Sequence, residues 1–248
     1  MKALLLICHG SRTKAGTEKA REFAEQCMRH IDYPIKEVCF LELSKPDIAK
    51  GVESCVRQGA TSICAIPILL LTAAHAKEDI PGELQIQQER FLHIEFTYGK
   101  PFGVHESISS LLWERITEST DAFKEKSLIL LVGRGSSDPD VKRDLKAIAA
   151  HLEENYKIPP IETCFLTAAQ PSFEEMLRLA GWGYEQVIIV PYLLFPGILL
   201  SGMKKAIAEQ ARETGQELIL CEALGYHPVL QEVLLSRIDE AQRQRTVV

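Results

Sequence analysis

The chain has 248 residues, of which 46% are hydrophobic and 25% are charged, enough for one large globular domain or two of about 120 residues. Its formal net charge of −6, with no long run of Lys and Arg, argues against binding to nucleic acid or to an anionic membrane surface. An acidic small molecule would therefore need a local cluster of basic side chains.

Cysteine usage and the N-terminal residues bear on the cellular compartment. Seven cysteines are spread along the chain, mostly in apolar runs, and none form a C-x-x-C pair. This pattern predicts buried free thiols in a reducing compartment, without a zinc knuckle or an iron–sulfur cluster. The apolar run that ends at Cys8 is too short for a signal peptide or a membrane span, which favours a cytoplasmic location.

Apolar runs of β type alternate with amphipathic helical stretches, a pattern typical of βαβ units around a parallel sheet. We expect strands near residues 2–8, 36–41, 62–68, 93–98, 127–132, 161–166, 186–191 and 217–221. We expect helices near residues 16–30, 47–58, 77–90, 105–119, 139–156, 172–181, 201–214 and 228–243. The predicted fold is α/β, with two similar flavodoxin-like lobes that each contain a four-stranded parallel sheet flanked by helices.

The two halves also match residue by residue. Residues 4–11 (LLLICHGS) align with residues 129–136 (ILLVGRGS), 125 positions later. The offset decreases to 122 between His105 and His227, as short loop deletions would cause. We infer a tandem duplication of one α/β unit. The expected lobes are residues 1–122 and residues 123–248.

Three residues that can bind metal ions follow predicted strands of the first half. His9 ends the first strand, Glu42 ends the second, and His75 lies in the loop after the third. Open parallel sheets bind ligands beyond the carboxyl ends of their strands, and neighbouring strands lie about 4.8 Å apart. If these strands adjoin, the three side chains can converge on one ion. Two imidazoles and one carboxylate suit Fe(II), Co(II), Ni(II) or Zn(II) and leave coordination positions open.

The second half serves as an internal comparison for this set. The residues that align with His9, Glu42 and His75 are Arg134, Thr167 and Leu199. All three ligating groups are lost together, which predicts one metal site per chain, in the N-terminal lobe.

The other histidines are interpreted as structural. His105 and His227 each follow a Gly-x pair at matching positions of the two halves, which indicates a shared helix-start feature. The remaining three stand in helix or strand contexts: His30, His93 and His151.

Three motifs taken together resemble those of the sirohydrochlorin chelatases. They are His9-Gly-Ser-Arg12, Glu42-x-x-x-Pro46 and His75-Ala-Lys-Glu-Asp-Ile-Pro81. The resemblance covers essentially the whole chain and includes the two-half architecture of class II chelatases. It implies insertion of Fe(II) into sirohydrochlorin to form sirohaem, or of Co(II) on the way to cobalamin, with no organic cofactor and the divalent ion as a substrate. Some relatives carry a C-terminal histidine-rich tract or cysteine cluster; this sequence has neither, which favours iron.

The requirements of metal insertion suggest roles for the candidate residues. His9 and His75 would hold the ion while the macrocycle replaces its waters, and Glu42 would act as ligand and as proton acceptor. Because sirohydrochlorin is a polycarboxylate, basic residues near the strand ends are expected to bind it. These candidates are Arg12, Lys45, Lys77 and Arg134. Gly10, Gly133 and Gly135 would either admit a flat ligand to the backbone or form tight turns.

Alternatives to iron insertion remain open at this point. The same residues would serve a cobaltochelatase, or a carrier that delivers its ion without chemistry on a tetrapyrrole. A nucleotide-binding domain is disfavoured because no glycine-rich phosphate loop follows the first strand. The expected partner is therefore a tetrapyrrole, with neither nucleic acid nor membrane, and we expect hand-over from other enzymes of the sirohaem pathway.

Overall fold

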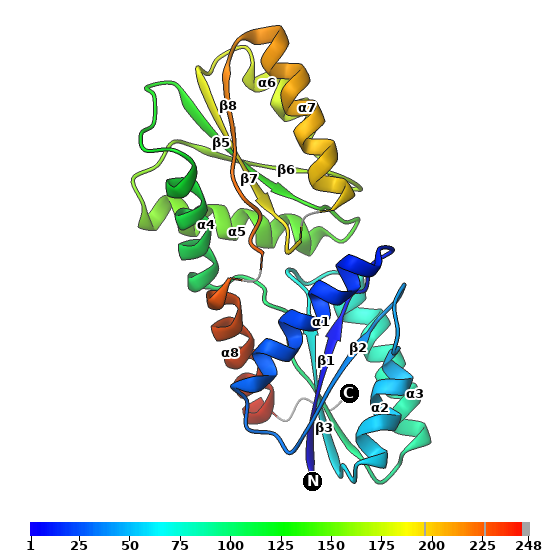
Figure 1. Cartoon of the computed structure of the whole chain (residues 1–248). Coiled ribbons are helices and arrows are strands. Elements are labelled where there is room, and N and C mark those ends of the chain that lie inside the picture. The colour runs from blue at the N-terminus through cyan, green and yellow to red at the C-terminus, as the bar shows by residue number, and fades with distance from the viewer. Residues whose placement is uncertain (196, 226, 245–248) are drawn as a thin grey trace. The chain divides into compact units, whose positions relative to one another are not determined.

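A computed structural model describes residues 1–195, 197–225 and 227–244 (Figure 1). The first repeat contains β1 (Lys2–Cys8), α1 (Lys14–Arg29), β2 (Ile35–Phe40), α2 (Ile48–Arg57), β3 (Ser62–Ile68), η1 (His75–Asp79), α3 (Ile80–Arg90), β4 (Glu95–Tyr98) and α4 (Glu106–Ser119). The second contains β5 (Ser127–Gly133), α5 (Pro139–Asn155), β6 (Ile161–Phe165), α6 (Phe173–Ala180), β7 (Gln186–Tyr192), α7 (Ile198–Thr214), β8 (Glu217–Leu220) and α8 (Pro228–Gln244). The expected order of elements is confirmed, and their ends differ from the expected ones by a few residues.

The strands form two parallel sheets of four strands each. The order is β2-β1-β3-β4 in the first and β6-β5-β7-β8 in the second, so the two repeats share one topology. In the first sheet, Cys8 at the end of β1 pairs with Phe40 on one side and with Ile68 on the other. The carboxyl ends of β1, β2 and β3 therefore lie at the same level of the sheet.

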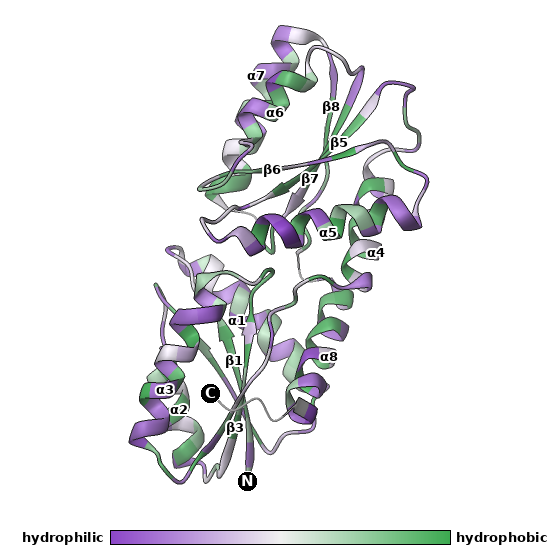
Figure 2. Cartoon of the chain, turned by 180° about the vertical axis from the view of Figure 1, so that it is seen from behind, coloured by the Kyte–Doolittle hydropathy of each residue, from purple (hydrophilic) through white to green (hydrophobic). Residues whose placement is uncertain are grey.

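Helices cover both faces of the first sheet because side chains of successive strand residues point to opposite faces. Leu5 and Ile7 of β1 pack with Val52 of α2 and Leu84 of α3 in one apolar core. On the other face, the Cys8 thiol contacts the carbonyl of Ala20 on α1. Figure 2 shows hydrophobic residues along the strands and hydrophilic residues on the outer sides of the helices.

The chain folds into two compact units whose boundaries differ from those of the expected lobes. One unit contains residues 1–103 together with α8 from residue 230 onward, and the other contains residues 104–229. Each repeat thus ends in a helix that packs in the other unit. The division expected between residues 122 and 123 follows the sequence repeat, whereas the units follow the packing.

Apolar side chains and hydrogen bonds explain where these two helices belong. Helix α4 buries Ile108, Leu111 and Leu112 and packs on α5 and β7 of the second unit. In the first unit, Arg237 of α8 donates hydrogen bonds from Nε to the carbonyls of Pro101 and Phe102, at 3.0 Å and 3.1 Å. An apolar helix following a strand can cover any sheet that offers a free face, so the repeat itself does not fix its location.

The backbone repeats its unusual conformations at matching positions. Gly10 has φ 100° and Gly135 has φ 94°, and the non-glycine residues Leu43 and Ala168 have φ 59° and 50°. Both pairs are separated by the 125 positions that the sequence alignment predicts. The internal duplication therefore extends to the conformation of the loops that follow the strands.

The seven cysteines are free and buried, as predicted. Burial raises the pKa of the Cys8 thiol to about 12 and that of Cys64 to about 11, which keeps both protonated near neutral pH. Within the described part of the chain, no helix has the length and apolar character needed to cross a bilayer.

Candidate metal centre

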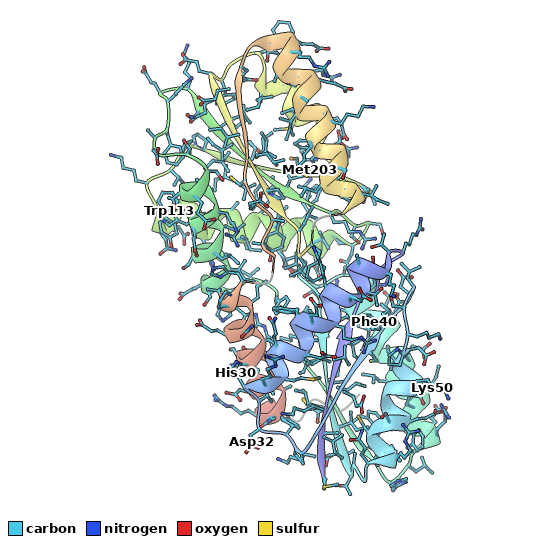
Figure 3. All side chains as sticks on the ribbon, in the orientation of Figure 1. His30, Asp32, Phe40, Lys50, Trp113 and Met203 are labelled. Carbon is cyan, nitrogen blue, oxygen red and sulfur yellow. The ribbon has the colours of Figure 1, made fainter. Side chains whose placement is uncertain are left out.

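The first sheet brings together the loops that carry His9, Glu42 and His75. Strand β1 lies between β2 and β3, so the three strands adjoin as the prediction required. His9 follows β1 directly, Glu42 lies two residues beyond Phe40, which ends β2 (Figure 3), and His75 is the first residue of η1. The chain turns from β1 toward β2 on one side and from β3 toward β4 on the other, so β1 and β3 flank the topological switch point where open α/β sheets bind ligands.

The side chains of His9, Glu42 and His75 converge. One potential ligand atom from each lies within 4.8 Å of those of the other two. The Nε2 atom of His9 is 3.6 Å from Oε1 of Glu42, and the rings of His9 and His75 meet edge to face with centroids 5.0 Å apart. Among the residues that the structure describes, no other group of three His, Cys, Asp or Glu side chains lies this close together.

The cluster faces solvent on one side. The side chains of His9, Glu42 and His75 are 24%, 46% and 36% exposed. Two imidazoles and a carboxylate occupy three positions around a divalent ion, and an open side leaves positions for water or for nitrogen ligands of a second molecule. The geometry therefore fits an ion that is received and passed on, since a closed site would fill all positions with protein.

Backbone and hydroxyl contacts fix the loop that carries Glu42. The Glu42 N–H donates to the His9 carbonyl at 3.1 Å. The Ser44 hydroxyl accepts the Ser11 N–H at 3.0 Å and lies 2.8 Å from the Thr17 hydroxyl. The loops after β1 and β2 are thus joined directly beside the cluster. Sequence reasoning missed Ser44, whose counterpart in the second repeat, 125 positions later, is Ala169.

The glycines at the strand ends serve packing and turns. Gly10 and Gly135 have positive φ, and a Cβ at either position would meet the carbonyl of the neighbouring loop. At Gly133 a Cβ would lie 3.0 Å from Leu145 and 3.2 Å from Phe165, both in the core. Of the two expected roles, the tight turn applies to Gly10 and Gly135, while Gly133 makes room for the core.

His75 lies in a turn of π-helix that the sequence did not predict. We expected a helix from residue 77, but residues 75–79 already form η1. The Nδ1 atom of His75 lies 2.6 Å from Oδ2 of Asp79, and the Tyr98 hydroxyl donates to the Ala76 carbonyl at 2.9 Å. Asp79 is a second residue that sequence reasoning missed; its signal is the spacing of four residues after a candidate ligand on a helical turn.

The predicted substrate-binding residues differ in their availability. Arg12, three residues after His9, is exposed and forms no ion pair with any described residue. Lys45 is exposed and pairs with Asp47, the N-cap of α2. Lys77 is exposed on η1, and Arg134 is exposed after β5 in the second unit.

Among the described residues, the corresponding edge of the second sheet gathers no ligand set. The Thr167 hydroxyl donates to the Arg134 carbonyl at 3.0 Å, and Leu199 packs against the apolar core of its unit.

The predicted helix-start roles of the paired histidines, His105 and His227, are confirmed. Nδ1 of His105 accepts the Ser107 N–H at 3.2 Å, and Nδ1 of His227 accepts the Val229 N–H at 3.4 Å.

The fold and this cluster together define a duplicated α/β protein with one open group of divalent-metal donors. The CbiX family model matches the chain twice, over residues 3–119 and 128–241. The sirohydrochlorin ferrochelatase of Priestia megaterium is 49% identical over 239 residues, which cover 96% of this chain and 90% of the relative. The chain therefore belongs to the CbiX family, as the resemblance to sirohydrochlorin chelatases implied, and it is a metal chelatase.

Two solved structures are similar over nearly their full length. SirB from Bacillus subtilis with Fe3+ is 39% identical, with a TM-score of 0.89 and coverage of 97% of this chain and 95% of that one. The sirohydrochlorin chelatase SirB from Bacillus subtilis subspecies spizizenii in complex with cobalt is 35% identical, with a TM-score of 0.85 and coverage of 98% and 96%. These likenesses confirm the predicted pair of four-stranded parallel α/β lobes.

Proposed function

We propose that the chain inserts Fe(II) into sirohydrochlorin and so forms sirohaem. The observation that carries the proposal is the convergence of ligand atoms from His9, Glu42 and His75 within 4.8 Å at the open edge of the first sheet. The relative from Priestia megaterium is a sirohydrochlorin ferrochelatase, which supports both the substrate and the metal.

The chemistry of insertion divides among the three side chains. A divalent ion enters the macrocycle as two pyrrole N–H protons leave, so the site must hold the ion and accept protons. The neutral imidazoles of His9 and His75 hold the ion without adding charge. Glu42 partly neutralises the ion and accepts a pyrrole proton, and its 46% exposure lets that proton pass on to water.

Basic residues beside the cluster supply the attraction for a polycarboxylate in an otherwise acidic chain. We assign Arg12 the main role in the first unit, since its guanidinium is exposed, has no described ion-pair partner and can grip a carboxylate with two hydrogen bonds. Lys45 must break its ion pair with Asp47 before it can bind the substrate, which lowers its net contribution to substrate binding. Lys77 and, in the second unit, Arg134 are the remaining candidate contacts.

Cobalt is the second candidate metal, because one of the similar structures is a chelatase in complex with cobalt. The donor set does not distinguish the two ions, since imidazole and carboxylate accept both Fe(II) and Co(II). Only the rates of insertion decide between them.

An anaerobic absorbance assay tests the proposal. Sirohydrochlorin is mixed with Fe(II) or with Co(II), with and without protein, and the change in the tetrapyrrole spectrum is followed in time. We expect the protein to accelerate insertion of both ions and to give the larger kcat/KM with Fe(II). Faster insertion of Co(II) would assign the chain to cobalamin synthesis, and metal binding without any acceleration would make it a carrier.

A further inference from the structure

We propose that Asp79 is a positioning residue that holds the His75 ring so that its Nε2 atom faces the transferred metal ion. The Oδ2 atom of Asp79 lies 2.6 Å from Nδ1 of His75. A carboxylate can only accept a hydrogen bond, so Nδ1 carries the hydrogen and the lone pair stays on Nε2. This inference deepens the proposed function, because it rests on His75 being a ligand of the ion.

The turn that carries both residues is held in place by the rest of the unit. The N–H of Ile80 bonds to the His75 carbonyl, which closes the five-residue π-helix η1. Ala76 is buried at 5% exposure, and its carbonyl accepts the Tyr98 hydroxyl of β4. Single π-turns occur frequently at functional sites. With this backbone fixed, the position of the imidazole depends on rotation of the side chain.

Packing alone does not stop that rotation. The His75 side chain is 36% exposed, and its edge-to-face contact with the His9 ring covers only one side. A short charge-assisted hydrogen bond from the His75 Nδ1–H to Asp79 selects one orientation and one tautomer. An outer hydrogen-bond partner of this kind also strengthens a histidine as a metal ligand.

The second repeat lost the acceptor together with the imidazole. The offset of 124 that aligns Pro67 with Pro191 places Leu199 over His75 and Met203 over Asp79. Met203 is 1% exposed in the apolar core of its unit, on the regular helix α7 (Figure 3). The pair of His75 and Asp79 thus corresponds to the apolar pair of Leu199 and Met203 in the second repeat.

Co(II) titration in the absence of tetrapyrrole tests the inference, with binding followed by visible absorption. We expect Asp79→Ala to weaken Co(II) binding by about 10- to 100-fold, the usual loss when a metal-bound histidine loses its outer partner. Asp79→Asn keeps an acceptor oxygen and removes the charge, so its loss should be smaller. Glu78→Ala is the matched control, because Glu78 is the neighbouring exposed carboxylate on η1 and should leave Co(II) affinity within about twofold.

A purely structural role would leave a different signature. Asp79 is 52% exposed, so Asp79→Ala should retain the thermal unfolding midpoint of the parent chain while changing the Co(II) spectrum. Parent-like Co(II) affinity and spectrum in Asp79→Ala would overturn the inference. A different result would contradict the proposed function and leave the inference on Asp79 intact. In that case the parent chain would bind Co(II) tightly and Asp79→Ala would bind it weakly, but neither would accelerate metal insertion into sirohydrochlorin.

Discussion

Gly10 and the carbonyl of Glu42 approach each other so closely that a Cβ built on Gly10 would lie 1.9 Å from the Glu42 oxygen. Gly10 also has φ 100°, a conformation that other residues rarely adopt. The absent side chain therefore lets the loop after β2 pass directly over the end of β1. This contact sets the position of Glu42 relative to His9.

We expect Gly10→Ala to lower the free energy of unfolding and to weaken Co(II) binding. The left-handed conformation alone costs an alanine about 1 to 2 kcal/mol, and the clash adds to this unless the Glu42 loop moves. Movement of this loop to relieve the clash would displace Glu42 from the two histidines. Urea unfolding and Co(II) titration measure the two effects.

Gly135→Ala is the matched control for that variant. Its Cβ would lie 1.8 Å from the Thr167 carbonyl, at φ 94°, so the loss of stability should be similar. The described residues of the second unit form no ligand set at this edge, so Co(II) affinity should stay that of the parent chain. Equal loss of Co(II) affinity in both variants would show that global destabilisation, not the position of Glu42, weakens the site.

Arg12→Ala tests the attraction for the substrate. We expect KM for sirohydrochlorin to rise roughly fivefold, which corresponds to about 1 kcal/mol, the usual scale for one exposed charge contact. The value of kcat should change less, because the contact is equally strong before and during insertion. Lys50→Ala is the control, since Lys50 pairs with Glu53 on α2 and should leave both constants unchanged. An unchanged KM in Arg12→Ala removes this residue from the substrate site.

Thiol labelling tests the predicted state of the cysteines. Burial raises the pKa of Cys8 and of Cys164 to about 12, so at pH 8 these thiols stay protonated and lack the reactive thiolate. We expect almost no reaction with an aromatic disulfide reagent in the folded chain. In denaturant, all seven free cysteines should react. Rapid labelling of the folded protein would contradict the burial of these residues.

The sequence predicted the gathering of His9, Glu42 and His75 because strand ends are marked locally and the fold limits how the strands pair. Apolar runs mark the ends of β1 and β3, and a duplicated flavodoxin-like unit restricts the strand order to few arrangements. The side chains that support the cluster were harder to predict from the sequence. Asp79 belongs to a π-turn, and the expected helix began at residue 77, which left His75 and its partner on different predicted elements.

The units in which α4 and α8 pack could not be predicted from the sequence, for a different reason. Both helices bury apolar side chains, and each packs in the unit formed mainly by the other repeat. A periodic apolar stripe predicts that a helix packs on a sheet, but it does not identify which sheet. The expected boundary between residues 122 and 123 thus falls inside the packed unit of residues 104–229.

Removing the histidines tests the assignment of the candidate metal centre. We expect His9→Ala and His75→Ala each to reduce Co(II) affinity and the rate of metal insertion by more than roughly 100-fold. This loss exceeds the one expected for Asp79→Ala, because the one imidazole and one carboxylate that remain hold a divalent ion poorly. His105→Ala is the control. Its ring accepts the Ser107 N–H at the start of α4, so the variant should lose some stability and keep Co(II) affinity.

Glu42→Gln separates proton transfer from folding at the same site. The amide keeps the size of the side chain and removes its charge and basicity, so the variant should fold normally, bind Co(II) more weakly and insert Fe(II) slowly even at saturating metal. Slow insertion at saturating metal distinguishes proton acceptance from simple ligation, because a lost ligand alone would be compensated by more metal. The assignment is wrong if the His9 and His75 variants keep parent-like affinity and insertion while His105→Ala loses both; the metal would then bind at the start of α4.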